Sequence, residues 1–74
     1  MFYVRIDGIS DNHLAFLGYT LVFEDHKHRL YRNYMGEEYA VPKHGKQYLL
    51  VEDMNDAQIL SDMSGSKVIV RSPP

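Results

Sequence analysis

The sequence predicts a small α+β domain, in which a three-stranded antiparallel meander is accompanied by two helices and by an extra strand at each end. Three observations lead to this prediction. Apolar and polar residues alternate near the start of the chain, and three β-rich segments follow one another before residue 42. On each side of these segments lies a stretch that begins with a helix-capping residue and ends at a glycine. With 74 residues, 45% of them hydrophobic, the chain forms a single domain over residues 1–74.

The opening strand and the first helix occupy the first 18 residues. Residues 2–7 alternate with a period of two, which predicts a half-buried strand that ends at Gly8. Ser10 can cap a two-turn helix, and Gly18 stands where a helix commonly ends. The apolar stripe that we expect on this helix is formed by Leu14, Phe16 and Leu17.

The centre of the chain predicts the meander. Regular alternation in its first segment places Leu21 and Phe23 on one face, and Pro42 ends the pairing because proline lacks an amide donor. Polar breaks separate the segments and favour hairpin connections. The three expected strands cover residues 19–24, 28–34 and 37–41.

The last third of the chain predicts a second helix and a short strand. Residues 48–51 suit either a further pairing strand or the lead-in to the helix. Asp53 or Asn55 caps the helix, and Gly65 ends it. Residues 68–70 are β-rich, and the Ser-Pro-Pro tail after them is unable to extend a ladder. The residues expected to share the buried helix face are Ile59, Leu60 and Met63.

Composition excludes several classes of protein. The absence of cysteine rules out a disulfide framework, a thiolate zinc site and a cysteine nucleophile. No apolar run approaches the roughly 20 residues that span a bilayer, so we expect no membrane partner. The first seven residues lack the features of a signal peptide, which predicts a cytoplasmic protein. A core of this size supplies only about 3–5 kcal/mol, so association into a homo-oligomer or with a partner would stabilise the domain.

Charge is distributed unevenly along the chain. Residues 1–25 carry a net charge of −3, residues 26–46 carry +3, and residues 47–74 carry −2. The basic block also contains three of the four histidines, interleaved with tyrosines. This combination predicts a surface for a polyanion such as RNA.

Residues 18–46 resemble the HicA-type mRNA interferase toxins of bacterial toxin–antitoxin systems. A glycine-aromatic step at Gly18 opens the first strand of the meander, and His28 stands in the place of the family's catalytic histidine. Tyr31 follows three residues later, and Val41-Pro42-Lys43-His44-Gly45 corresponds to the motif that ends the third strand. The resemblance implies a double-stranded-RNA-binding-like (dsRBD-like) α-β-β-β-α fold.

The resemblance also implies a function, which is metal-independent endonucleolytic cleavage of mRNA without a cofactor. His28 would be the general base that deprotonates the ribose 2′-hydroxyl, as an imidazole can do near neutral pH. An antitoxin protein would cover the site. Two alternatives remain: a non-enzymatic interaction or inhibitor protein of the phage or mobile-element type, and a non-catalytic RNA binder.

The candidate RNA-contacting residues come from the basic block. Alternation along the strand puts Arg32 on the same face as His28, and Arg29 on the other face with Tyr31. A zinc site made of His26, His28 and His44 is a weaker alternative, because these histidines have no carboxylate at matching parity, and the prediction is that no metal is bound. The full candidate set is Lys27, Arg29, Tyr31, Arg32, Lys43, His44 and Lys46.

Overall fold

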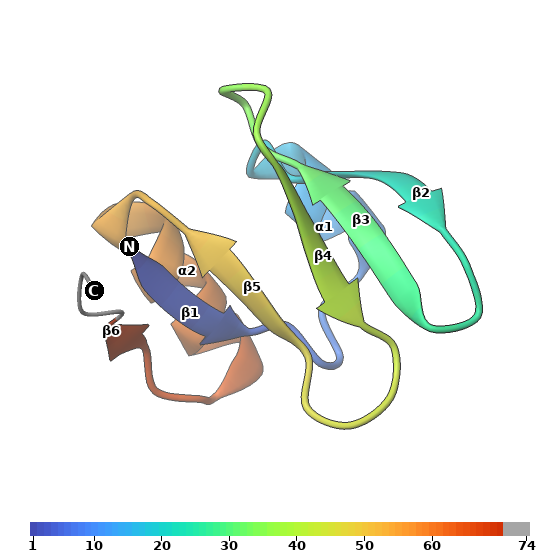
Figure 1. The fold of residues 1–74 in the computed structure, drawn as a ribbon. Coiled ribbons are helices and arrows are strands. Elements are labelled where there is room, and N and C mark those ends of the chain that lie inside the picture. The colour runs from blue at the N-terminus through green and yellow to red at the C-terminus, as the bar shows by residue number, and fades with distance from the viewer. Residues whose placement is uncertain (71–74) are drawn as a thin grey trace.

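The structure, a computed structural model, describes residues 1–70 and consists of two helices and two three-stranded antiparallel sheets (Figure 1). The predicted α+β class is confirmed. In chain order the elements are β1 (Phe2–Arg5), α1 (Asp11–Phe16), β2 (Thr20–Glu24), β3 (His28–Arg32), β4 (Glu38–Pro42), β5 (Tyr48–Val51), α2 (Met54–Ser64) and β6 (Ile69–Val70).

One sheet is the expected meander, with strand order β2-β3-β4. The other has the order β5-β1-β6, in which β1 pairs with strands from the last third of the described residues. Residues 48–51, which suited either a strand or the lead-in to the second helix, therefore form a strand that pairs with β1. The predicted terminal strand is present as β6, and the Ser-Pro-Pro tail lies outside the described residues.

Both helices begin at a side-chain cap that the sequence predicts. The Ser10 hydroxyl accepts a hydrogen bond from the His13 amide, and the Asp53 carboxylate accepts one from the Asn55 amide. Asp53, and not Asn55, is therefore the cap of α2. Gly65 ends α2 in the left-handed region, at φ 71°, where a residue with a side chain would be strained.

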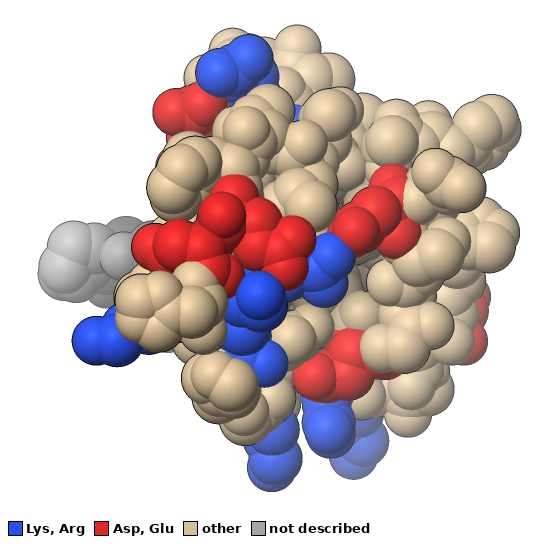
Figure 2. All heavy atoms as spheres, turned by 90° about the vertical axis from the view of Figure 1, so that its right-hand side faces the viewer, with Lys and Arg blue, Asp and Glu red and all other residues tan. Residues whose placement is uncertain are grey.

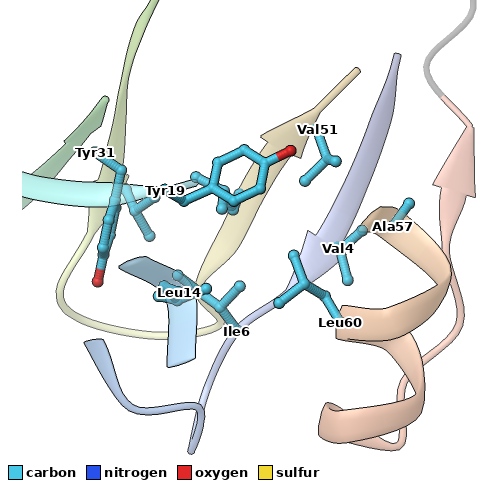
Figure 3. Packing of buried hydrophobic residues seen from close by; sticks show 10 residues of the cluster. Val4, Ile6, Leu14, Tyr19, Tyr31, Val51, Ala57 and Leu60 are labelled. Carbon is cyan, nitrogen blue, oxygen red and sulfur yellow. The ribbon is translucent and has the colours of Figure 1, made fainter. Parts of the chain in front are cut away.

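A single hydrophobic core connects the two sheets and both helices. In Figure 1 the helices lie behind the strands; α1 contacts β2, whereas α2 contacts β1 and β5. Tyr19, just before β2, extends across the core toward Val51 of β5 (Figure 3), and its hydroxyl donates to Asp56 of α2 at 3.1 Å. The buried cluster is Val4, Ile6, Leu14, Tyr19, Tyr31, Val41, Leu49, Val51, Ala57 and Leu60.

The helices bury only some of the residues expected. Leu14 is buried on α1 and Leu17, directly after this helix, packs partly buried against the core as expected, whereas Phe16 is 89% exposed because a six-residue helix turns a single narrow face to the core. On α2, Leu60 is buried with Ala57 and Ser61. The expectation that Ile59 and Met63 share this face is wrong, since both are exposed.

Strand β2 also departs from the expected alternation. Leu21 pairs with Tyr31 and Phe23 pairs with Leu30, so the register shifts by one residue at Val22. Such a β-bulge reverses the faces of the residues that follow it. Leu21 therefore faces the core, whereas Phe23 points to the opposite face and is 59% exposed.

Candidate functional site

Two loops meet at one end of the meander and form what we call the tip, residues 25–27 of the β2–β3 turn and residues 43–47 of the β4–β5 connection. The Lys43 amide donates to the carbonyl of Lys27 at 2.9 Å, which holds the loops side by side. Strand pairing of His28 with Pro42 continues this contact into the sheet. Residues separated by about 16 positions in the sequence thus share one surface.

Asp25 sets the shape of the β2–β3 turn. Its Oδ1 accepts hydrogen bonds from the amides of Lys27 and His28, at 2.8 and 2.6 Å. These two bonds lower the pKa of Asp25 below its ordinary value of 3.8. The carboxylate is consequently charged at neutral pH, and it is hydrogen-bonded to the backbone of its own turn.

Exposed basic and imidazole side chains gather at the tip and at the first residue of β3. Neither Lys27 nor Lys46 forms an ion pair with any of the described residues. From the predicted set, the structure therefore places Lys27, His28, His44 and Lys46 together at one end of the molecule. The exposed residues of this group are His26, Lys27, His28, His44 and Lys46.

The other cations of the predicted set are paired with acids. Lys43 Nζ lies 2.8 Å from Glu24 Oε1, and this hydrogen bond lowers the pKa of the Glu24 carboxyl. Arg32 donates from Nε and from a terminal nitrogen to one oxygen of Glu38, at 3.1 and 2.7 Å. Figure 2 shows acidic and basic side chains interleaved across the middle of this side of the molecule. Much of the basic block is therefore neutralised within the fold.

Arg29 and Tyr31 lie on the core-facing side of β3, under α1. Tyr31 is 1% exposed and its hydroxyl donates to Asp11 at 2.9 Å, while a terminal nitrogen of Arg29 donates to the other oxygen of Asp11 at 2.6 Å. The guanidinium carbon of Arg29 is 5.8 Å from the centre of the Tyr31 ring. Burial, followed by the bond to Asp11, raises the pKa of Tyr31. Tyr31 offers no ring face for stacking on a base in this structure.

Arg29 also retains an unused donor. Its Nε is buried without a hydrogen-bond partner among the described residues and lies 3.9 Å from Glu24 Oε1. Two acids from the first 25 residues, Asp11 and Glu24, thus surround this cation. Sequence reasoning missed them, although an acidic block that directly precedes a basic block of equal and opposite charge is a signal for such pairing.

His28 begins β3 on the face away from α1. It pairs with Pro42, and Arg32 lies on the same face at the other end of the strand. The grouping of His28 with Arg32, and of Arg29 with Tyr31, agrees with the alternation expected along this strand. Arg32 is held by Glu38, however, so Lys27 is the cation without an ion pair that stands nearest to His28 in the chain.

No group of three or more histidines and acids within residues 1–70 is arranged to hold a metal ion. His26, His28 and His44 share the tip region without forming such a group. The structure thus gives the zinc alternative no geometric support.

Comparison with known proteins does not extend these observations. No protein-family model, no curated protein and no solved structure matches the chain. In the part of the chain that the structure describes, neither helix has the length and apolar character needed to cross a membrane.

Proposed function

We propose that this domain binds RNA through its tip. The observation that carries the proposal is the contact between two loops, at the Lys43 amide and the Lys27 carbonyl, because these loops and the first residue of β3 carry the exposed side chains of His26, Lys27, His28, His44 and Lys46. Lysines without an ion pair can neutralise phosphates and release the counterions that surround them, a process that supplies most of the affinity in sequence-independent binding.

The surroundings of the tip also indicate how RNA would be recognised. Tyr31, the aromatic residue expected to stack on a base, is buried. Phosphate contacts fix the position of a nucleic acid but carry no sequence information, whereas base stacking and base-edge contacts distinguish sequences. We therefore expect backbone contacts and little sequence preference.

The resemblance to HicA-type toxins supports the choice of RNA over other polyanions. The order α1-β2-β3-β4 corresponds to the first four elements of the dsRBD-like arrangement that this family implies; β5 then precedes α2, and α2 packs on β1 and β5 and not on the meander. In this proposal the second sheet is an addition that α2 covers. The meander remains the element that carries the RNA-contacting loops.

Cleavage of the bound RNA is a second candidate function, and the exposure of His28 beside the tip favours it. A neutral imidazole here would take the proton of a ribose 2′-hydroxyl, whose oxygen then attacks the adjacent phosphate. Lys27 is the cation available to stabilise the charge that develops on the phosphorane. In a toxin of this type, an antitoxin would act by covering the tip.

The binding proposal is tested by fluorescence anisotropy with a labelled single-stranded RNA and a labelled hairpin. The paired change Lys27→Glu and Lys46→Glu should weaken binding of both RNAs at least tenfold. Each single change at the tip, Lys27→Glu or Lys46→Glu, has a control of equal charge change in Lys67→Glu, an exposed lysine between α2 and β6, which should have little effect. Equal losses from a single tip change and the control would refute a specific role for the tip, and no binding by the wild type would favour the protein-inhibitor alternative.

Cleavage is tested separately by induced expression in bacteria, in which growth and mRNA integrity are followed together. If His28 is the general base, the wild type and His13→Ala arrest growth with mRNA decay, whereas His28→Ala does not. His13 is a suitable control because its ring bonds to Ser10 at the start of α1. RNA binding by a wild type that leaves mRNA intact would retain the binding proposal and remove the catalytic one.

A further inference from the structure

Lys43 belongs to the tip, but an acid of the same chain binds its side chain. The Lys43 amide donates to the carbonyl of Lys27 at 2.9 Å, so the two lysines are neighbours across the two loops. The Lys43 ammonium lies 2.8 Å from Oε1 of Glu24, the last residue of β2, which directly precedes the turn. A lysine next to a proposed RNA-contacting lysine is therefore occupied by a carboxylate of its own chain.

The geometry of Glu24 shows which of two neighbouring cations it binds. The same oxygen, Oε1, is 3.9 Å from Nε of Arg29, which is too far for a hydrogen bond, and this nitrogen is buried without a partner among the described residues. A carboxylate placed to complete the hydrogen bonds of Arg29 would approach Nε. Glu24 binds the ammonium of Lys43 instead, and that hydrogen bond is the largest cause of the lowered pKa of Glu24.

We infer that Glu24 competes with RNA for Lys43 and thereby limits the affinity of the tip. This inference rests on the proposed binding of RNA and adds a third phosphate contact to it. A carboxylate and a phosphate bind an ammonium in the same way, through opposite charge and through hydrogen bonds that the nitrogen donates. In the free protein the carboxylate holds this position. When the RNA backbone lies on Lys27, a neighbouring phosphate replaces the carboxylate at Lys43.

The exchange requires little rearrangement of the fold. The side chains of Glu24 and Lys43 are 38% and 31% exposed, so both groups reach solvent. Ion pairs that are open to water contribute little to stability, because solvent screens them. Arg29 keeps its hydrogen bond to Asp11, at 2.6 Å, when the Glu24 side chain turns away. The displaced carboxylate then returns to water without leaving Arg29 as an isolated charge.

The size of the effect follows from counterion release. One further phosphate contact on a single strand makes the slope of log affinity against log salt steeper by about 0.7, which corresponds to about a fourfold gain in affinity at about 0.15 M salt. Removing the competitor with Glu24→Gln should therefore change the slope from about −1.4, the value for two contacts, to about −2.1, and tighten binding about fourfold. Glutamine retains the size and shape of the glutamate side chain and removes its charge.

The experiment is fluorescence anisotropy of the full chain with a labelled single-stranded RNA over a range of salt concentrations. The matched control is Glu38→Gln, because Glu38 is also 38% exposed and is paired with a cation of the meander, Arg32, at 2.7 Å. Glu38 lies at the other end of the sheet from the tip, where it pairs with the last residue of β3. The control should keep the wild-type slope and affinity. Circular dichroism checks that each variant is folded.

A double variant tests whether the gain depends on Lys43. Glu24→Gln combined with Lys43→Gln should return to the wild-type slope, because the competitor and its lysine are both removed. A double variant with the slope of Glu24→Gln, or equal gains from Glu24→Gln and Glu38→Gln, would reveal an effect of net charge alone and overturn the inference. RNA binding through Lys27 and Lys46 without any gain from Glu24→Gln would overturn the inference and retain the proposed function. Absence of RNA binding by the wild type and by every variant would overturn both.

Discussion

A single carboxylate, that of Asp11, forms hydrogen bonds with two candidate site residues, Arg29 and Tyr31. It accepts a hydrogen bond from the Tyr31 hydroxyl on one oxygen and one from Arg29 on the other. Removing the hydroxyl with Tyr31→Phe should lower the free energy of unfolding by about 1 kcal/mol, the usual net contribution of such a bond. RNA affinity should not change. Urea denaturation and fluorescence anisotropy check the two halves of this prediction.

A different result would assign Tyr31 to the site. If Tyr31→Phe kept its stability but bound RNA much more weakly, the hydroxyl would have to contact the ligand. Asp11→Ala is the informative companion, because it removes the acceptor of both bonds and should destabilise the protein more than Tyr31→Phe does.

Tyr31 also illustrates what a strand sequence reveals about a site. Alternation with a period of two was sufficient to group Tyr31 with Arg29 and to separate both from His28. It did not indicate which of the two faces would be buried, because that depends on where α1 packs and on the position of Asp11, 20 residues earlier in the chain. Local pattern therefore predicted the grouping, and tertiary contact decided the exposure.

The β2–β3 turn is the element whose geometry most directly shapes the tip. Asp25→Ala removes the acceptor of the Lys27 and His28 amides and should lower stability at neutral pH. Because folding lowers the pKa of Asp25, its contribution is present above the ordinary value of 3.8 and is lost as the pH falls through the lowered native value. Urea midpoints of wild type and variant should therefore differ at pH 7 and converge in strong acid.

Asp62→Ala provides the control for this comparison. Asp62 is exposed on α2 and accepts a hydrogen bond from the Gln58 side chain, without holding any turn. The variant should remain close to the wild type at both extremes of pH. A gap between wild type and Asp25→Ala that stays constant into strong acid would contradict a role for the charged carboxylate.

The positions of the helices and strands were predicted better than which of their faces are buried. Caps and breaks located both helices and the meander because those signals act within a few residues. The β-bulge at Val22 has no such local signal, and it reverses the faces of the residues after it, so Phe23 was expected beside Leu21 and lies opposite. On α2, the shallow contact with β1 and β5 buries Ala57 and leaves Ile59 exposed, a choice that periodicity alone did not reveal.

At the scale of the whole molecule, Tyr19 links the two sheets. It lies in the core and donates across to Asp56 of α2, and burial is the main cause that raises its pKa, as it is for Tyr31. A raised tyrosine pKa gives stability that is present below the ordinary value of 10.0 and is lost as the pH rises through the native value. The wild type should therefore lose stability steeply above pH 10.

Replacing both tyrosines separates this effect from general alkaline unfolding. The double variant Tyr19→Phe and Tyr31→Phe should be less stable than the wild type at neutral pH, by about 2 kcal/mol if the two bonds contribute independently. Its stability should fall less steeply between pH 10 and strong alkali. Parallel curves for the two proteins would show that neither hydroxyl titrates with unfolding.

In the folded molecule, charge is distributed differently from its distribution along the sequence. The basic block of residues 26–46 predicted a polyanion surface, and the fold brings Asp11 and Glu24 from the preceding acidic block against Arg29 and Lys43. Charge counted along the sequence thus overstates the charge presented to a ligand. The tip lysines Lys27 and Lys46 remain without ion-pair partners among the described residues.

This difference leads to a quantitative prediction for RNA binding. Each phosphate contact on a single strand lowers the slope of log affinity against log salt by about 0.7. If Lys27 and Lys46 are the main contacts, the wild-type slope should be about −1.4. If all five cations of the basic block took part, the slope would be about −3.5.

Salt titrations of single variants distinguish these cases. Lys27→Gln and Lys46→Gln should each make the slope shallower by about 0.7, whereas Arg32→Gln should leave it nearly unchanged because Glu38 already neutralises that arginine. Glutamine is used so that no new negative charge is introduced. An Arg32→Gln slope that changed as much as those of the lysine variants would mean that RNA displaces Glu38, and the contact surface would then extend from the tip along the whole of β3.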